Sequence, residues 1–328
     1  MTTVLGGLRH YGRMLLSAVG LVFTVVLLMF ILLQMAPGDP IQALVGDMPV
    51  PQEYREQLTR QYGLDKPLYL QFLYYVGNVA TGDLGYSYAN GEPVSQLILA
   101  RLGNTLLITV PALVLSSVIG IVLGAIAART RMRWLDNLIS VGSLFIFSIP
   151  GFWLGLMLIL VFAVMLEWLP AQGMTSFTSS GLSLRHMILP VVALTAGQIA
   201  FKARVMRSST IEALGQDYID TARAKGLSSQ QVLWRHALKN AMLPIIGVIG
   251  YGAGFTLAGS VFVESVFAWP GMGLLLYDSI QRREMMVVMG IVLVVAVSVV
   301  IINLLTDVVY GLVDPRVRVK LRQGRGLE

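Results

Sequence analysis

The residues Tyr218-Ile219-Asp220-Thr221-Ala222-Arg223-Ala224-Lys225-Gly226-Leu227 form a short polar stretch between two strongly apolar runs. Most of these residues favour a helix, and the glycine at position 226 is a typical helix stop. An otherwise apolar chain has little reason to fold a compact, charged helix in water unless another protein binds it. The stretch therefore indicates the membrane-embedded part of a larger assembly.

The rest of the sequence has the composition of an integral membrane protein. Hydrophobic residues make up 55% of the 328 positions and charged residues only 13%, whereas soluble proteins carry about a quarter charged residues. Six uncharged runs predict six transmembrane helices, and all but the fourth reach the roughly 20 residues that cross the hydrocarbon. The fourth can span if Lys202 and Arg204 extend their charged ends to the headgroups. We therefore predict an all-α membrane protein with six transmembrane helices, TM1 to TM6.

The basic residues predict the orientation. Most of the 24 Lys and Arg residues fall in segments that face the cytoplasm if the N-terminus is cytoplasmic, as the positive-inside rule requires. Both termini are then cytoplasmic. The predicted segments are the N-terminus (1–13), TM1 (14–36), an extracytoplasmic segment (37–101), TM2 (102–128), TM3 (137–166), TM4 (186–206), a cytoplasmic loop (207–239), TM5 (240–263), TM6 (285–307) and the cytoplasmic tail (308–328).

Several classes of protein are excluded. The chain has no cysteine, which rules out disulfides, thiolate metal sites and cysteine nucleophiles. The histidines His10, His186 and His236 fall at three different membrane boundaries, so we expect no metal site, and no Ser/His/Asp set indicates catalysis. The net charge of +6 follows the membrane boundaries without forming a patch, so we expect no nucleic-acid partner. The first apolar run is too long for a cleavable signal and is expected to remain as an anchor.

The extracytoplasmic segment is predicted to hold a polar surface helix over Gln52 to Tyr62. The following run, Leu68 to Val79, is rich in aromatic residues that suit the headgroup level of a membrane. The same run could instead be a docking surface for a partner outside the membrane, and both interpretations stay open.

Small residues predict close helix packing at two places. Gly120 and Gly124 are four residues apart on one helix face, as are Gly250 and Gly254.

The polar loop carries several helix signals. Asp217 can cap the start of a helix, Gly226 can end it in a left-handed conformation, and Ser228 can cap the next helix. Ile219, Ala222 and Leu227 supply sparse apolar contacts. These signals predict a short helix that fits a groove on another protein.

Two motifs around this loop resemble the permease subunits of bacterial ABC importers for dipeptides, oligopeptides and nickel. They are Asp217-Tyr218-Ile219-Asp220-Thr221-Ala222-Arg223-Ala224-Lys225-Gly226-Leu227 and Val232-Leu233-Trp234-Arg235-His236-Ala237-Leu238-Lys239-Asn240-Ala241. The resemblance runs in register from about Arg9 to Arg318. It also includes Ala36-Pro37-Gly38-Asp39-Pro40, Gly63-Leu64-Asp65-Lys66-Pro67-Leu68, Gly82-Asp83-Leu84-Gly85, Ser148-Ile149-Pro150-Gly151-Phe152-Trp153-Leu154-Gly155, Glu264, Phe267-Ala268-Trp269-Pro270-Gly271 and Asp314-Pro315-Arg316.

The resemblance implies a type I ABC importer permease fold in the bacterial inner membrane. It implies four kinds of partner: a homologous second permease in a heterodimer, two ATPase subunits that bind ATP and Mg, an extracytoplasmic solute-binding protein, and the lipid bilayer. The chain has no Gly-x-x-x-x-Gly-Lys-Ser/Thr phosphate loop. We therefore expect a transport subunit without enzymatic activity or a cofactor of its own.

The resemblance also implies a role for the polar loop. Permeases of this family carry a Glu-Ala-Ala…Gly pattern whose short helix inserts into a cleft on the ATPase. Here Asp220-Thr221-Ala222 stands in the Glu-Ala-Ala place, with Asp for Glu and Thr for Ala, and Gly226 stands in the glycine place. The predicted coupling residues are Asp217, Tyr218, Asp220, Thr221, Ala222, Arg223, Lys225, Gly226, Leu227 and His236.

Glu264 and Trp269 are candidates for the pathway or its outer gate. Glu264 precedes the family-like motif at the predicted outer end of TM5. The alternative is an ordinary boundary carboxylate, whose charge costs little because water is close.

The leading hypothesis is a permease subunit that forms, with a homologous chain, the pathway for di- or oligopeptides. Within the family, the alternative is import of nickel or a metal chelate, and glutathione-like peptides and opines also stay open. From another class, an ion-coupled secondary transporter would need ionisable groups near the bilayer midplane. A receptor or scaffold would not need an ATPase-docking loop.

Overall fold

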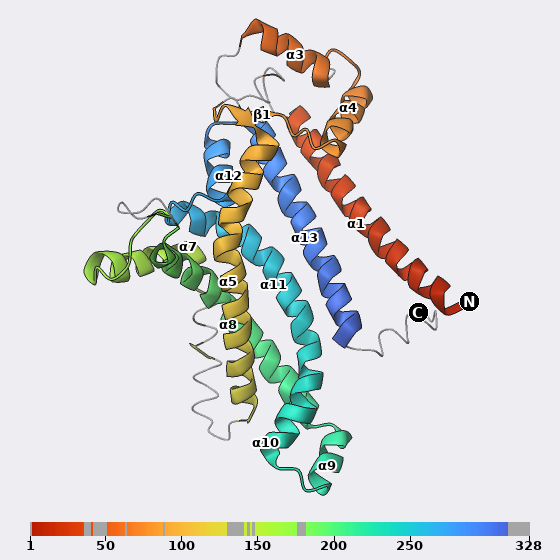
Figure 1. Cartoon of the computed structure of the whole chain (residues 1–328), viewed down its shortest axis with the longest axis vertical. Helices are drawn as coiled ribbons and strands as arrows, with labels where there is room; N and C mark the ends of the chain where they lie inside the picture. Colours follow the sequence, from red (N-terminus) through yellow and green to blue (C-terminus); the bar gives the residue numbers. More distant parts are fainter. Residues whose placement is uncertain are drawn as a thin grey trace. The chain divides into compact units, whose positions relative to one another are not determined.

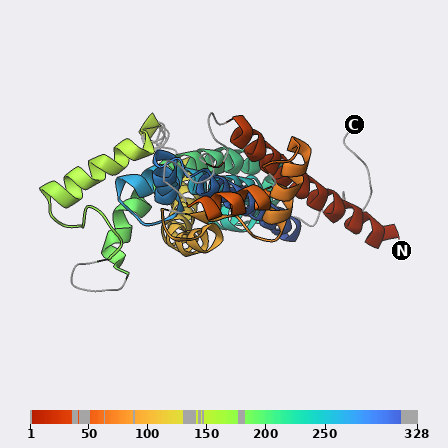
Figure 2. The ribbon, with the colours of Figure 1, turned by 90° about the horizontal axis from the view of Figure 1, so that it is seen from above.

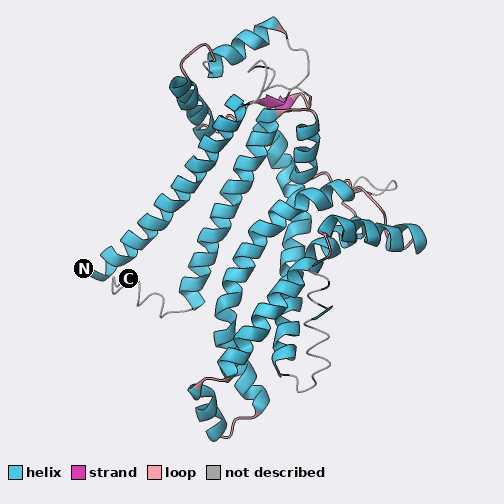
Figure 3. Cartoon of the chain, turned by 180° about the vertical axis from the view of Figure 1, so that it is seen from behind, coloured by secondary structure: helices cyan, strands magenta, loops and turns pink. Residues whose placement is uncertain are grey.

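The structure is a computed structural model of the chain. It describes residues 2–35, 41, 51–62, 64–87, 89–129, 141–142, 145, 148–175 and 182–313. The predicted turn at 36–40, the first part of TM3 and the tail from residue 314 lie outside these residues. The described part is helical apart from loops and one small hairpin (Figure 3), which confirms the all-α fold class.

Five helical segments among the described residues are long and apolar enough to cross a membrane. They are Met14–Met35 within α1 (Thr2–Met35), α5 (Val94–Arg129), α8 (Leu184–Leu214), Ser229–Val266 ending in α11 (Leu238–Val266), and α13 (Met285–Val313). They correspond to the predicted TM1, TM2, TM4, TM5 and TM6.

The predicted third span differs from the others. Its longest continuous described part is a short α7 (Gly151–Leu158) continued by the π-helix η1 (Ile159–Met165). Pro150 is the N-cap of α7, because proline has no N–H to continue a preceding helix and restricts the residue before it. Helix of this length is too short to cross about 30 Å of hydrocarbon. The predicted count of six spans is therefore not reached in the described residues.

The chain divides into two compact units. The first unit comprises Met1–Gly7, Leu106–Trp269 and Ile301–Glu328, and the second comprises Leu8–Thr105 and Pro270–Val300.

In the first unit, α5, α7 and α11 pack with α8 (Figure 1). Gly120 and Gly124 face α8 directly: a Cβ on Gly120 would lie 2.7 Å from the Cβ of Lys202, and one on Gly124 would lie 2.5 Å from the carbonyl oxygen of Ala203. A Cβ on Gly250 of α11 would likewise collide with Thr306 of α13. The predicted close packing is confirmed at Gly120, Gly124 and Gly250.

Lys202 does not reach the headgroups. Its side chain is fully buried, and its Nζ donates hydrogen bonds to Ser116 Oγ at 2.7 Å and Ser117 Oγ at 3.0 Å on α5. The prediction that Lys202 extends to the membrane surface is therefore wrong. The physical reason is that α8 continues to Leu214, so Lys202 lies in the middle of a helix that packs closely on α5.

The second unit combines most of the N-terminal third of the chain with a segment near its C-terminal end. Its elements are α1, α3 (Gln52–Tyr62), α4 (Leu68–Ala80), the strands β1 (Tyr86–Ser87) and β2 (Glu92–Pro93), and α12 (Met272–Gln281), together with the first turns of α5 and α13. The two strands pair antiparallel, with Tyr86 opposite Pro93 and Ser87 opposite Glu92. The predicted helix over Gln52 to Tyr62 is confirmed.

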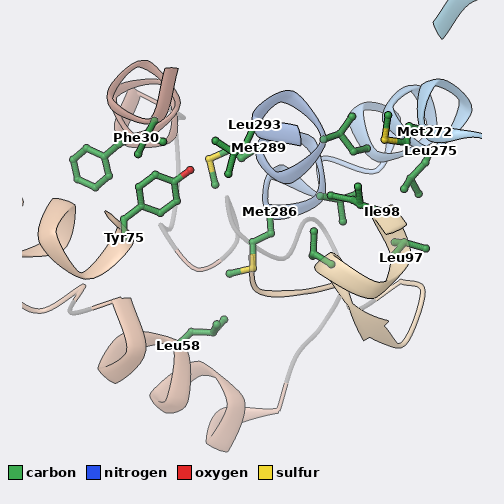
Figure 4. Packing of buried hydrophobic residues seen from close by; sticks show 14 of the residues in the cluster. Phe30, Leu58, Tyr75, Leu97, Ile98, Met272, Leu275, Met286, Met289 and Leu293 are labelled. Atoms are coloured by element: carbon green, nitrogen blue, oxygen red, sulfur yellow. The ribbon is translucent and has the colours of Figure 1, made fainter. Parts of the chain in front are cut away.

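One apolar core holds the second unit together (Figure 4). Phe30, Leu58 and Tyr75 bring α1, α3 and α4 against Met286 and Met289 of α13. On the other side of α13, a Cβ on Gly290 would lie 2.8 Å from Val94 Cγ1 and 2.9 Å from Ile98 Cδ1 of α5. The start of α12 is fixed to α5, because Thr105 Oγ1 accepts a hydrogen bond from Met272 N at 2.8 Å.

Candidate functional site

The polar loop forms a small folded projection in the first unit, at the end of α8. We call residues 215–237 the knob. Its first helix is α9 (Asp217–Ala224), with Gln216 as N-cap and no side-chain cap. The predicted capping by Asp217 is wrong, because this residue is already in the first turn of the helix. There Asp217 and Asp220 still interact favourably with the positive end of the helix dipole.

Gly226 ends α9 as predicted. Its φ of +78° is left-handed, a conformation that glycine adopts without steric cost. The N–H of Leu227 donates to the Ala222 carbonyl at 3.4 Å, and the N–H of Gly226 donates to the Arg223 carbonyl at 2.9 Å. These two bonds form a Schellman motif, which satisfies the last carbonyls of the helix.

Ser228 caps the second helix of the knob, as predicted. Its side chain and Gln231 form a reciprocal capping box at the start of α10 (Ser229–Val232). A π-helical turn, η2 (Leu233–Ala237), then leads into α11. Single π-turns within helices are often found at functional sites.

One face of α9 is anchored to the rest of the unit. Ile219 is fully buried and Ala222 is 5% exposed. They belong to a core cluster built from α8, η2 and α11, with Ala125 of α5. Its buried members are Ala125, Met206, Ala213, Ile219, Ala222, Val232, Leu233, Ala237, Leu238, Ala241 and Ile245. The knob is therefore packed against the ends of two long helices.

The opposite face of α9 is polar and exposed. It carries Asp217, Tyr218, Asp220, Thr221, Arg223 and Lys225. Arg223 pairs with Asp220 at 3.0 Å on this surface. Gly226 is also exposed, and a Cβ there would meet nothing within 4 Å.

The predicted coupling residues thus all lie on the knob, but they differ in exposure. Ala222 is buried, and Leu227 and His236 are half-buried. Trp234 was missing from the predicted set, although it is 64% exposed on the knob. The sequence held a signal for this position, because Trp234 directly follows the apolar pair Val232 and Leu233. The structure buries this pair, which leaves the tryptophan on the exposed side of the helix.

The knob presents a folded, polar surface. In the part of the chain that the structure describes, no group of three His, Asp or Glu residues could hold a metal ion. The exposed face instead combines an aromatic ring, an acidic and basic pair, and backbone held by caps on both helices. Such a surface can be recognised by another protein and can transmit force to α8 and α11.

A second feature of the same unit is an apolar cavity of about 750 Å³ between α7, α8 and α11. Its lining includes the aromatic side chains Phe152, Phe201, Tyr251, Phe255 and Phe262, with Gln198 and Thr256 as polar groups. A cavity of this size is in the range of small-molecule sites.

Glu264 and Trp269 do not line this cavity. Both side chains are fully buried. The backbone N–H of Trp269 donates to the backbone carbonyl of Glu264 at 2.9 Å. Trp269 packs with Ile108, Ala112 and Val191. The alternative of an ordinary boundary carboxylate assumed that water lies close to Glu264. Because its side chain is fully buried, that alternative does not account for a carboxyl at this position.

Two family models match the chain. One, described as binding-protein-dependent transport system inner membrane component, covers residues 120–319. The other, for the N-terminal part of such membrane components, covers residues 8–109.

Curated relatives match along nearly the whole chain. It is 39% identical to the oligopeptide transport system permease protein AppB of Bacillus subtilis over 309 residues, which cover 93% of this chain and 98% of that one. It is also 39% identical to the glutathione transport system permease protein GsiC of Escherichia coli (strain K12), covering 95% of this chain and 100% of that one. The di/tripeptide transport system permease protein DppB of Pseudomonas aeruginosa is 39% identical, with coverages of 90% and 94%.

The fold is similar to that of a solved transporter. An inward-facing structure of the MetNI methionine ABC transporter aligns with a TM-score of 0.55 and 21% identity, covering 67% of this chain and 97% of that one. At this identity the likeness shows the fold alone.

Proposed function

The chain belongs to the family of inner membrane components of binding-protein-dependent transport systems, and we propose that its knob couples it to separate ATPase subunits. It is a multi-pass permease subunit of a peptide-type ABC importer. The assembly that we propose contains a homologous second permease, two ATPases that hold ATP and Mg, and an extracytoplasmic solute-binding protein.

The observation that carries this proposal is the two-sided construction of α9. Ile219 and Ala222 fix one face to the core of the unit, while Tyr218, Arg223 and Lys225 remain exposed on the other. An isolated helix of this length would be marginal in water. The anchoring therefore supports a role in which a partner pushes or pulls on the exposed face.

The proposed mechanism requires only a change of population. Closure of the ATPases on ATP would displace the knob, and the long helices would move between arrangements open to opposite sides. ATP and loaded binding protein can shift this equilibrium only as far as they bind the two arrangements differently. The sequence carries no phosphate-binding loop, so the nucleotide belongs to the partners in this proposal.

The cavity between α7, α8 and α11 is proposed as this chain's share of the translocation pathway. Its apolar and aromatic lining, with few polar groups, would accept many side chains without selecting among them. The names of the relatives support peptides as cargo over nickel. Glu264 and Trp269 remain proposed elements of an outer gate; both side chains are buried in this structure.

A substitution at Gly226 tests the coupling proposal. We expect Gly226→Trp to abolish peptide uptake by the reconstituted complex in vesicles while the chain remains in the membrane. Its side chain would project from an exposed position into the space of the partner, and its left-handed φ would add strain of about 1–2 kcal/mol. Peptide uptake and ATP hydrolysis stimulated by loaded binding protein are the measurements.

Gly226→Asn is the matched control. Asparagine tolerates the left-handed conformation better than other side chains and is small, so this variant should keep most of the uptake. Normal uptake by Gly226→Trp would count decisively against docking of an ATPase at the knob.

A further inference from the structure

Two neighbouring helices of the second unit have opposite surfaces. The exposed residues of α3 are polar or charged: Gln52, Glu53, Glu56, Gln57 and Arg60. Those of α4 are apolar or aromatic: Leu68, Tyr69, Leu73 and Tyr74. No charged residue occurs between Leu68 and Ala80. Water therefore explains the exposed surface of α3 but not that of α4.

Aromatic contacts place α4 beside the apolar window of α1 (Figures 1 and 2). The ring of Phe72 lies 5.2 Å from that of Phe30 and 5.9 Å from that of Phe23. At 1.5 Å per residue, Phe30 and Phe23 lie about 7 Å and about 18 Å along α1 from Met35, the end of its candidate span. Phe72 is therefore at a depth that belongs to hydrocarbon.

α13 provides a second measure of depth. Tyr75 and Val79 of α4 line the same small pocket as Met286, Met289 and Leu293, with Asp83 at its edge just after α4 ends, and Tyr75 points toward Met289 in Figure 4. These residues belong to the first turns of the candidate span that begins at Met285. Leu293 lies about 12 Å along α13 from Met285. Contacts with two candidate spans thus place α4 alongside the C-terminal half of the α1 span and the first turns of the α13 span.

The polar groups at the start of α4 have partners within the protein. The Gln71 amide donates to the carbonyls of Lys66 at 2.8 Å and Leu64 at 3.3 Å. Its Oε1 accepts from Gln34 Nε2 of α1 at 2.9 Å. Every polar atom of the Gln71 side chain is therefore satisfied without water, as a membrane environment requires.

Lys66 marks the headgroup level. Its Nζ donates to the Tyr74 hydroxyl at 3.2 Å and lies 5.2 Å from the centre of that ring. The hydrogen bond that Lys66 donates to Tyr74 raises the pKa of the Lys66 amine, so the amine stays charged. A lysine beside a tyrosine is typical of the interface between hydrocarbon and water.

We propose that α4 is embedded in one leaflet of the bilayer, with the face formed by Tyr69, Leu73, Gly77 and Ala80 covered by lipid acyl chains. Lys66 and Tyr74 hold its N-terminal end at the headgroups. The lipid-covered surface continues that of α1, which exposes Val19 and Leu32 at 58% and 57%. The helix would act as an anchor that supports α1, which is otherwise poorly buried. This inference does not depend on the proposed function.

Single cysteines can test this proposal because the chain has none of its own. Leu73→Cys and Tyr69→Cys, which replace side chains 60% and 67% exposed, would carry a nitroxide label on α4. Gln57→Cys on the exposed face of α3 is the matched aqueous control, and Val19→Cys on α1 is the lipid control. The full complex is reconstituted in vesicles of phosphatidylethanolamine and phosphatidylglycerol. Collision rates of each label are measured with oxygen, which dissolves in lipid, and with a water-soluble nickel chelate.

We expect the labels at residues 69, 73 and 19 to collide several-fold more with oxygen than with the chelate. The label at residue 57 should show the reverse. Chelate access at residues 69 and 73 equal to that at residue 57 would overturn the proposal. Chelate access that is lost only when loaded binding protein is added would overturn it too, because it would make this face a protein-docking surface. The two α4 positions give separate readings if one variant fails to assemble.

Discussion

At the scale of single residues, Lys202 shows how a buried charge is accommodated in a membrane helix. Its amine donates to the hydroxyls of Ser116 and Ser117 on the closely approaching α5, and the side chain is fully buried. The sequence could not predict this contact, because the two serines are more than 80 positions away. A basic residue at the end of a short apolar run is normally expected to extend toward the headgroups. In contrast, the roles of Gly226 and Ser228 were predictable, since each depends on neighbours within a few residues.

The hydroxyl pair around Lys202 leads to a prediction. We expect Ser116→Ala with Ser117→Ala to lower the free energy of unfolding by about 3 kcal/mol or more, because the buried amine loses its partners. Lys202→Met should cost much less, since it removes the charge and keeps the volume. Unfolding midpoints of the purified complex are the measurement. If Lys202→Met destabilised as strongly as the double serine variant, the amine would have a stabilising role beyond these bonds.

At the scale of elements, α9 is held in place by its buried face alone, through Ile219 and Ala222. The spacing of Ile219, Ala222 and Leu227 was visible in the sequence, and the structure buries the first two. What the sequence could not show is their partners, which come from α8, η2 and α11. The interruption at Pro150 was similarly visible as a proline, but its effect on the third span depends on packing that no local pattern reveals.

A variant that loosens the packing of α9 against its core should weaken the proposed coupling to the ATPases, while the complex still assembles. We expect Ile219→Ala to cost about 2–5 kcal/mol of local stability, because it leaves a cavity under α9. Stimulation of ATP hydrolysis by loaded binding protein should then fall, and proteases should cleave the knob faster. Thr221→Ala, on the exposed face, should leave the rate of proteolysis unchanged. Equal protease resistance of both variants would show that Ile219 does not hold the knob in place.

At the scale of the whole molecule, the family and the helical membrane fold were accessible from the sequence because motifs run along almost its whole length. The cavity and the burial of Glu264 could not be predicted from the sequence, because both depend on how helices far apart in the chain pack together.

The proposed division of labour predicts that the purified chain is inactive by itself. Alone in sealed vesicles with ATP, it should accumulate no labelled dipeptide. Addition of the second permease, both ATPases and loaded binding protein during reconstitution should restore uptake. Accumulation by the single chain would mean that another energy source drives it, such as the ion coupling of a secondary transporter.

The uninterrupted course of α8 has a mechanical consequence. Leu194 and Gln198 line the cavity, while Met206 and Ala213 of the same helix hold the knob. About 22 Å of continuous helix separates Gln198 from Ala213, with no proline or glycine between them. Such a rod has no joint at which a stroke could be absorbed. If the cavity belongs to the pathway, as proposed, tilting of α8 at the knob changes the shape of the cavity directly, without a relay of intermediate side chains.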